Sequence, residues 1–559
     1  MSVRFHFAAV LALLPLNAIA ADDPGLKAAR AFYEGIRTET LPNGLRVYLK
    51  PIPGAPVVTT MVAYKVGSAD ENLDATGLSH YLEHLMFKGT EKLVPGDIDR
   101  MTMRSGGRNN ADTSEDMTVY HFDFAADQWD TALRIEADRM RNLRIDAKHE
   151  FEQEKGAVIS ELEMDEDRPF DLEMKAIVPL LFGKTAPYGH PVIGERQHVR
   201  SATAEVIKAH YDRWYYPNNA ALVVAGGFEP DKAMSRIREL FSAIPAGHLP
   251  ERKSAQAVVR DHPVRVDMPS KFEVPRMLMG FNGVRSGDPD FYTLEVIQTI
   301  LSGGKTSRLY RKLVEGEEIA SQVEATDNAG RYPGSFLVNV ELLKGKPRDK
   351  AEQLVLAELK RLADEQVGPE ELNRIRRIVT AGYVFGREGV HGLADSIARG
   401  VTTNNLEYLQ TYLPRILAVT PAEVQAAAKK YLDPQRRVVI WSVPGEGHAG
   451  AAAEGDSVRP RRAAANPDTG AFDLKRTRRV VLPNGLTLLL LEDHRLPIVA
   501  ARAFVKETRV TEPADKAGVA SLVGNLLDEG TKSKTGQQIA AAIEDVGGSL
   551  TAGASGGSV

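Results

Sequence analysis

The stretch GLSHYLEHLMFKGT, residues 77–90, combines the spacing of a buried helix with polar side chains that are unusual in a core. Its apolar residues recur every three or four positions, which predicts a helix with one core-facing stripe. This stripe consists of Leu78, Leu82, Leu85 and Met86. His80 and His84 stand four positions apart, so on a helix they point the same way, one turn apart. Glu83 then lies on the adjoining face.

The order H-x-x-E-H is one of the arrangements found in zinc metallopeptidases. Neutral imidazoles suit zinc, and a catalytic zinc takes three protein ligands and leaves a fourth position for water. Zinc lowers the pKa of that water toward about 7, so Glu83 can remove its proton as the water attacks a peptide carbonyl. The alternative is that His80 and His84 are hydrogen-bonded core residues. The stretch therefore predicts a single zinc ion with both histidines as ligands and Glu83 as the general base.

An internal repeat tests this prediction. LPNGLRVYL at Leu41 returns as LPNGLTLLL at Leu482, an offset of 441 residues. At the same offset, GVASLVGNLLDEGT at 518–531 aligns with the first stretch, and VGGSLTAGAS from Val546 aligns with SGGRNNADTS from Ser105. Three matches at one offset indicate one complete unit followed by the start of a second.

The second copy lacks the chemistry of the first. It has Ser521, Gly524 and Asn525 where the first copy has its two histidines and its glutamate, while glycines and apolar positions remain. The histidines are therefore not needed to build the helix, which argues against the core alternative. Two full units predict a chain of about 880 residues. We therefore expect the second copy to be truncated at the counterpart of Thr118.

Composition excludes several classes of protein. Hydrophobic residues make up 43% of the chain and charged residues 26%, which is ordinary for a soluble globular protein. No run of about 20 apolar residues follows the first twenty positions, so we expect no membrane span. The net charge of -5 is small for this length and argues against a nucleic acid partner. The chain has no cysteine, which excludes disulfides.

The N-terminus, MSVRFHFAAVLALLPLNAIAADDP, has the pattern of a secretory signal peptide. Arg4 supplies the positive start, an apolar stretch follows, and Ala18 to Ala20 form a small-residue cleavage site. A membrane anchor is the alternative, but the apolar stretch is too short to span a bilayer and contains Pro15. We expect cleavage after Ala20 and export to the periplasm.

The pattern of strands and helices predicts the α+β fold class. Short β-branched stretches bounded by turn residues, such as VVTTMVAYKVGS, alternate with stretches of helical spacing, such as DKAMSRIRELFSAI. The connector GEGHAGAAAEGDSVRPRRAAANPDTG is rich in glycine, alanine and charge. The expected organisation is a signal peptide at 1–20, an N-terminal α+β peptidase domain with the zinc site at 21–245, a second α+β domain at 246–445, a flexible linker at 446–470, and a truncated repeat of the peptidase domain without the zinc motif at 471–559.

A third zinc ligand is required, and the stretch FEQEKGAVISELEMDEDRP offers the best acidic candidates. If residues 151–165 are helical, Glu154 and Glu161 share one face with Phe151 and Val158. Acids placed among apolar residues need a buried partner. The alternative is a solvated acidic helix, which suits the residues Glu163, Asp165, Glu166 and Asp167.

HYLEH followed by EQEKGAVISELEMDED resembles the pitrilysin, insulinase and mitochondrial processing peptidase family of inverted-motif zinc metalloendopeptidases. The resemblance extends to LPNGLRV, GGRNNADTSEDMTVY, YGHPVIG and YYPNNAALVVAGGF, and covers nearly everything after the signal peptide. It implies that Glu161 is the third zinc ligand and that Glu154 is a catalytic acid that supports the site.

The resemblance also places a substrate-binding edge strand at Asn110, Ala111 and Thr113. An extended peptide can add itself to such an edge through backbone hydrogen bonds, while pockets for side chains set preference. Peptides are therefore the expected substrates.

In this family two halves enclose the substrate like a clamshell, so two consecutive α+β subdomains are expected to form one half, followed by the truncated start of the second. The far half commonly supplies an arginine and a tyrosine that stabilise the transition state. In GGKTSRLYRKLVEGEEIASQV the arginine is present as Arg308, but Ser321 replaces the tyrosine. The leading hypothesis is an exported zinc metalloendopeptidase. The alternative is a non-catalytic zinc- and peptide-binding scaffold subunit that needs a partner chain, either a second family subunit or another copy in a homodimer.

Overall fold

The computed structural model describes residues 24–147, 150–252, 258, 260–445, 477–505 and 512–553. The expected signal peptide at 1–20 and the expected linker at 446–470 lie outside the described residues. None of the described helices combines the length and apolar character needed to cross a bilayer.

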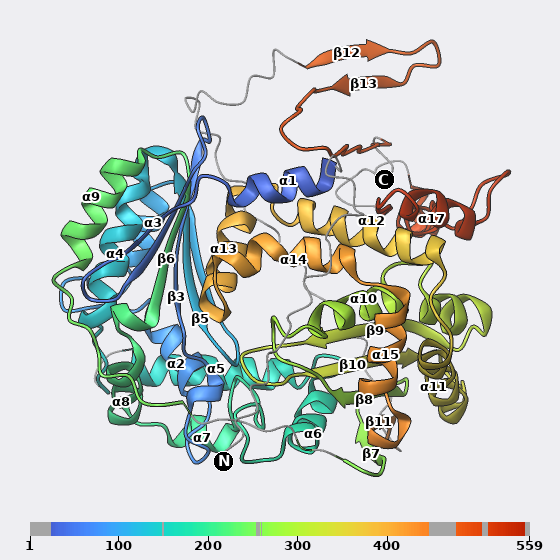
Figure 1. Ribbon diagram of the computed structural model, residues 1–559, viewed down its shortest axis with the longest axis horizontal. Helices are drawn as coiled ribbons and strands as arrows, with labels where there is room; N and C mark the ends of the chain where they lie inside the picture. Colours follow the sequence, from blue (N-terminus) through green and yellow to red (C-terminus); the bar gives the residue numbers. More distant parts are fainter. Residues whose placement is uncertain are drawn as a thin grey trace, which may run out of the picture.

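The first of two large sheets lies at the left of Figure 1. Its strands are β1 (Arg37–Thr40), β2 (Arg46–Pro51), β3 (Val57–Tyr64), β4 (Arg108–Thr113), β5 (Thr118–Ala125) and β6 (Ala220–Gly226). Across the sheet their order is β1-β2-β6-β3-β5-β4, and only β2 and β6 are parallel neighbours. β4 is therefore an edge strand.

Seven of the described helices build the core on one face of this sheet. They are α2 (Leu78–Leu85), α3 (Asp97–Arg104), α4 (Trp129–Asn142), α5 (Phe151–Asp165), α7 (Arg196–Ser201), α8 (Ala204–Trp214) and α9 (Pro230–Phe241). Each of them contributes apolar side chains to a single buried cluster. The α+β class predicted from the sequence is thus confirmed for this part of the chain.

The second large sheet has its own helical layer, at the lower right of Figure 1. Its strands are β7 (Val264–Ser270), β8 (Arg276–Asn282), β9 (Ala320–Asn328), β10 (Ser335–Leu342) and β11 (Val438–Pro444), in the order β7-β11-β8-β10-β9. The helices of this layer are α10 (Phe291–Ser302), α11 (Arg348–Asp364), α12 (Pro369–Phe385) and α15 (Pro421–Tyr431), with a short π-helix at Tyr310–Gly316.

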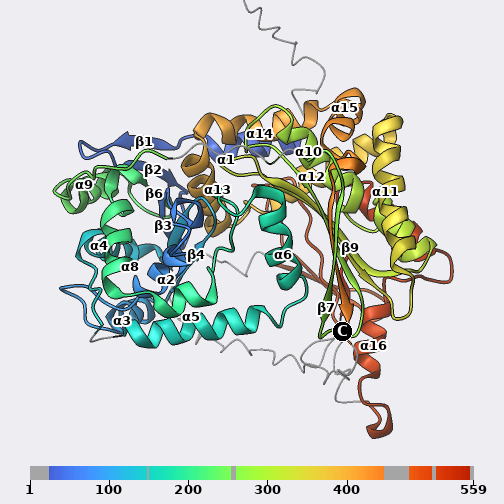
Figure 2. The same ribbon diagram turned by 90° about the horizontal axis from the view of Figure 1, so that it is seen from below.

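Each large sheet is partly covered by helices from the part of the chain that forms the other sheet. α6 (Asp171–Phe182) follows α5 in sequence but packs on β8 and β11, where Ile177 and Leu181 meet Leu278 and Ile440. In return α13 (Val390–Thr403) and α14 (Leu406–Ala418), together with α1 (Pro24–Tyr33), cover the second face of the first sheet. Figure 1 shows α13 and α14 between the sheets, and Figure 2 shows α6 beside the second sheet. Neither sheet is therefore covered only by helices that are close to it in sequence.

The alternation of side chains along β5 explains why the first sheet is covered on both faces. Tyr120, Phe122 and Phe124 point into the core that contains α2, whereas Val119, with Met117 directly before the strand, belongs to the cluster that contains α13. Because successive side chains of a strand point to opposite faces, a shift of one residue would exchange the two sets. The pairing of the strand is therefore fixed by both layers.

The second copy of the repeat has the local structure of the first. α16 (Val519–Leu526) and β12 (Arg478–Val481) begin and end 441 positions after α2 and β1. The hairpin of β12 and β13 (Thr487–Leu490) also keeps the register of β1 and β2, since Arg37 faces Leu49 and Arg478 faces Leu490. The repeat found in the sequence is thus present in the structure.

A carboxylate holds the start of the repeated helix in both copies. Glu71 accepts the N–H groups of Gly77 and Ser79 at 2.7 and 2.6 Å, and Glu512, 441 positions later, accepts the two equivalent N–H groups at 3.2 and 2.6 Å. These N–H groups have no partner within the helix, and the acid side chain satisfies two of them. Burial raises the pKa of Glu71 to about 8, although the bonds from Gly77 and Ser79 act in the opposite direction. The contact explains why the helix begins at the same place in both copies.

The second copy docks on the loop after α10 through α17 (Gly536–Glu544), which lies beside α12 in Figure 1. Glu544 accepts the N–H groups of Lys305 and Thr306 at 2.8 and 3.0 Å. Gly304 has a φ of 101°, and a Cβ at this position would lie 2.5 Å from the Glu544 carboxylate. Glycine therefore lets the acid approach the loop.

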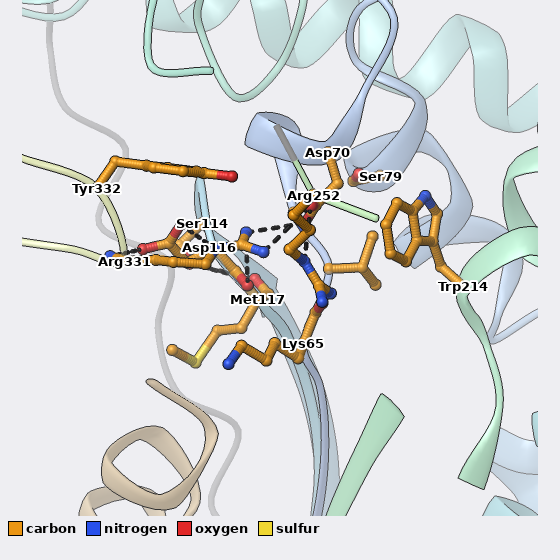
Figure 3. Close-up of polar contacts among 12 residues, drawn as sticks. Lys65, Asp70, Ser79, Ser114, Asp116, Met117, Trp214, Arg252, Arg331 and Tyr332 are labelled. Atoms are coloured by element: carbon orange, nitrogen blue, oxygen red, sulfur yellow. Dashed lines mark hydrogen bonds and ion pairs between the residues drawn. The ribbon is translucent and has the colours of Figure 1, made fainter. Parts of the chain in front are cut away.

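A buried ion cluster joins the second sheet to the first (Figure 3). Arg331, in the loop between β9 and β10, binds Asp70 with two nitrogens at 3.1 and 2.8 Å and Asp116 with its Nε at 3.1 Å. Arg252 binds Asp70 from a second direction at 3.1 Å and lies over the ring of Trp214. Asp116 follows β4 closely, so the cluster fixes the end of the edge strand.

We predict that Arg331→Ala lowers the free energy of unfolding by about 3 to 5 kcal/mol, because it leaves buried Asp116 without a cation and buried Asp70 with Arg252 alone. The matched control is Arg285→Ala, which removes an exposed pair with Asp288 and should change stability by less than about 0.5 kcal/mol. Urea denaturation followed by tryptophan fluorescence measures both. Equal stability of the two variants would contradict the assigned role of Arg331.

Candidate metal centre and active site

α2 carries three of the sequence-predicted site residues into the first core. The helix follows Gly77, whose φ of 87° places it in the left-handed region, where a Cβ would also lie 2.5 Å from the Ile193 carbonyl oxygen. The predicted apolar stripe is buried, with Leu82 fully enclosed. Because the stripe faces the core, His80 and His84 face α5.

The predicted third ligand meets both histidines. The Oε2 atom of Glu161, on α5, lies 3.6 Å from the Nε2 of His80 and 3.4 Å from the Nε2 of His84. The two imidazole rings have their centroids 4.9 Å apart and their planes at 76°. One donor atom from each residue lies within 4.8 Å of the others, so the three could hold one metal ion. We call His80, His84 and Glu161 the donor group.

Glu154 contacts His84 of this group. It lies about two turns before Glu161 on α5, so the two acids are on the same side of the helix. Its Oε2 lies 3.3 Å from the Nδ1 of His84, and its Oε1 binds the Nζ of Lys88 at 2.9 Å. Burial opposes ionisation, but the hydrogen bonds from His84 and Lys88 lower the pKa of Glu154 overall. A carboxylate in this position fixes the ring orientation of a metal-binding histidine. No motif in the sequence had singled out Lys88.

The protonation of the two histidines differs. Burial, together with the neighbouring His84, lowers the pKa of His80 to about 4, so its ring is neutral at pH 7. Burial alone would lower the pKa of His84 as well, but hydrogen bonds to Glu154 and Glu161 raise it to about 9. Metal binding would have to displace this proton. Two imidazoles and one carboxylate form the donor set that zinc takes in peptidases, so the residues fit the ion.

Glu83 lies on the side of α2 that faces the edge strand. It is 9% exposed, and its Oε2 accepts a hydrogen bond from the Oγ1 of Thr113 at 2.5 Å. Burial raises the pKa of Glu83 to about 7, although the bond from Thr113 acts in the opposite direction. A carboxyl group with a pKa near the working pH is suited to accept and return a proton.

The three predicted substrate-binding residues all lie on β4, but they do not share a face. Ala111 and Thr113 are on the same face of the strand, and the contact of Thr113 with Glu83 places that face toward α2. Asn110 pairs with His121 of β5 and points to the opposite face. Only the backbone of β4 is therefore common to all three, and their contact with substrate stays a prediction.

Arg308 is not brought to this group. Its guanidinium binds both carboxylate oxygens of Glu371, on α12, at 2.9 and 2.8 Å. It is also not among the residues that line the cavity beside His80. Within the described residues Arg308 thus has a structural partner, and its role in the transition state stays a prediction.

A cavity of about 600 Å³ opens beside the donor group. His80 and Glu161 form part of its wall, and residues of both sheets complete it. Its apolar wall comes from α6 and β10 through Met174, Ile177, Val178, Leu181, Phe182 and Leu337. None of these residues was predicted from the sequence, although the apolar stretch AIVPLLFG at 176–183 follows the acidic helix, which ends at Asp165.

Two family sequence profiles match the chain. Residues 46–186 match the one described as Insulinase (Peptidase family M16), and residues 201–379 match the one described as Peptidase M16 inactive domain. His80, Glu83, His84, Glu154 and Glu161 all lie in the first match. Together the two matches span more than half of the chain.

Two curated relatives are named zinc proteases. An uncharacterised zinc protease of Streptomyces coelicolor is 28% identical over 407 residues, which are 71% of this chain and 87% of the relative. The zinc protease PqqE of Helicobacter pylori is 26% identical over 437 residues, which are 74% of this chain and 94% of the relative.

Solved structures share the fold. A protease from Helicobacter pylori matches with a TM-score of 0.69 at 24% identity, covering 73% of this chain and 99% of that one. The first half of the periplasmic protease PqqL from Escherichia coli matches with a TM-score of 0.61 at 20% identity, covering 74% and 92%. Fold and relatives thus define a protein of the zinc-peptidase type. The chain belongs to the insulinase family, peptidase family M16, which confirms the resemblance found in the sequence.

We predict that Glu161→Gln weakens zinc binding at this group by more than about 100-fold, because loss of a ligand should exceed the 10- to 100-fold effect of losing a supporting partner. Glu163→Gln, on the same helix but exposed and paired with Arg196, is the matched control and should bind zinc like the unchanged protein. Competition with a chromophoric chelator measures the affinity. Equal affinity in the two variants would remove Glu161 from the ligand set.

Proposed function

We propose that the chain is an exported zinc-dependent metalloendopeptidase that hydrolyses peptides or unfolded segments. One observation carries the proposal: the Nε2 atoms of His80 and His84 converge on one oxygen of Glu161, while Glu83 stands free of that group and beside the edge strand. Membership of a peptidase family and the names of its relatives support it.

His80, His84 and Glu161 would hold one zinc ion. When bound, zinc would lower the pKa of a water molecule and polarise the peptide carbonyl. Glu83 would take the proton of the attacking water and return it to the leaving amine, for which its pKa of about 7 is well placed. Glu154 would hold the ring of His84 in place and would not touch substrate.

The substrate would bind as an added strand along β4. Backbone hydrogen bonds to an edge strand hold any extended peptide, so folded proteins would be excluded and unfolded segments accepted. The apolar wall formed by α6 would accept an apolar side chain next to the cleaved bond, since it lies beside His80 and Glu161.

A scaffold subunit is the second candidate function. Two observations favour it: Arg308 is bound to Glu371, and α16 carries Ser521, Gly524 and Asn525 in place of His80, Glu83 and His84. Such a subunit would bind zinc and peptide but would need a partner, a second peptidase-family subunit or another copy of this chain, for turnover.

We predict that Glu83→Gln lowers the rate of cleavage of a quenched peptide by about 10² to 10⁴-fold while zinc content stays unchanged, because a general base contributes this much. Glu91→Gln, an exposed acid shortly after the same helix, is the control and should keep full activity. Chelation should abolish cleavage by the unchanged protein, and added zinc should restore it. Zinc content without any chelator-sensitive cleavage would favour the scaffold.

Export to the periplasm rests on the N-terminal pattern, and one of the structural relatives, PqqL of Escherichia coli, is a periplasmic protease. In bacterial cells that express the chain, we expect a periplasmic protein whose N-terminus is Ala21. Mass spectrometry of the purified protein measures this. An intact N-terminus in the cytosolic fraction would refute export without affecting the proposed chemistry.

A further inference from the structure

A second group of metal-binding side chains lies on the opposite face of the first sheet. It consists of His121 and Asp123 on β5 and His391 near the start of α13, with one donor atom of each within 4.8 Å of the others. The Nδ1 of His391 lies 3.0 Å from the Oδ1 of Asp123. None of these residues takes part in the donor group on α2, and no sequence motif marks them.

The second group repeats the ring geometry of the first on a different scaffold. The rings of His121 and His391 have centroids 4.7 Å apart and planes at 75°, against 4.9 Å and 76° for His80 and His84. The first pair owes this geometry to one turn of a helix. The second pair joins a strand to a distant helix, since His391 follows Asp123 by 268 residues in the chain.

Regular elements hold all three side chains. On β5, His121 and Asp123 continue the row of Met117 and Val119, which packs against α13. His391 follows the first residue of α13, and this helix packs on β3 and β6. A site built on strands and helices keeps its geometry better than one built on loops.

Two neighbouring side chains hold the carboxylate of Asp123 in its orientation. Its Oδ1 accepts a hydrogen bond from Thr59 at 2.7 Å, and its Oδ2 binds the Nε of Arg108 at 2.9 Å. Such partners fix the orientation of a ligating carboxylate. The side chain of Arg108 is 72% exposed, so its charge lies at the rim.

An ordinary ion pair between His391 and Asp123 explains only part of this arrangement. It leaves the ring nitrogens of His121 with no hydrogen bond to any residue that the structure describes, although the ring stands edge to face against a second imidazole. A metal ion would use one donor atom from all three residues at once. Two imidazoles and a carboxylate suit zinc, nickel or cobalt better than magnesium or calcium.

We propose that His121, Asp123 and His391 form a second binding site for a divalent transition metal, separate from the donor group on α2. Because His121 pairs with Asn110 and Asp123 with Arg108, the site lies directly behind the edge strand β4. An ion there would fasten α13 to the sheet that presents this edge. The proposal does not depend on catalysis by the chain.

The test counts zinc equivalents by chelator competition in the full chain. We expect two equivalents in the unchanged protein, one in Glu161→Gln, one in His391→Gln, and none in the double variant. His262→Gln removes an exposed histidine that pairs with Asp261 and should leave the count at two. Cobalt titration gives a second readout, since the visible bands of the second equivalent should disappear with His391→Gln.

An unchanged count in His391→Gln would overturn the proposal. If that variant fails to fold by circular dichroism, because it also loses the contact with Asp123, His121→Gln decides. The side chain of His121 makes no hydrogen bond to the described residues, so this variant should fold. A count of two in folded His121→Gln would remove His121 from the ligand set and overturn the proposal, and a count of one in the unchanged protein would show that the group is an ion pair only.

Discussion

A buried carboxylate, Glu71, holds the start of α2, and the position of the donor group follows from that contact. The helix is short, and its N-terminal N–H groups would be left unpaired in a core without this acid. Burial of its apolar side then fixes the rotation of the helix, which turns His80 and His84 toward α5 and Glu83 toward β4. The second copy keeps the acid and loses the donors, which shows that helix placement and metal chemistry are separate properties of this fold.

Both sheets contribute to the site, because helices from one part of the chain pack on the sheet formed by the other. α5 brings Glu161 to the histidines, and the chain then continues into α6, which packs on the second sheet and forms the apolar wall of the cavity. Arg331 returns from the second sheet to the end of β4. The first sheet with its own helices would therefore carry the donor atoms but lack much of the cavity wall beside them.

Local patterns allowed part of this to be predicted. The spacing of apolar residues identified α2, and α5 was assumed as a helix over 151–165, where the structure has it. The H-x-x-E-H order and the resemblance together selected His80, His84 and Glu161, which the structure brings together. Contacts between distant segments left no such pattern. A single sequence does not show tertiary packing, and three features of the site depend on it. They are the bond from Thr113 to Glu83, the packing of α6 on the second sheet and the contact of His391 with β5. Arg308 shows the converse, since its motif matched but its side chain binds Glu371.

β4 presents opposite chemistry on its two faces. Thr113 bonds Glu83 on one face, while Asp112 pairs with Arg399 on the other. A strand that slipped by one residue would turn Asp112 toward Glu83, and two neighbouring carboxylates favour the protonated state. Glu83, the proposed base, would then hold its proton and could not accept another. The register of β4 therefore influences the protonation of Glu83, and only a correctly paired edge strand would leave this residue able to act in the proposed reaction.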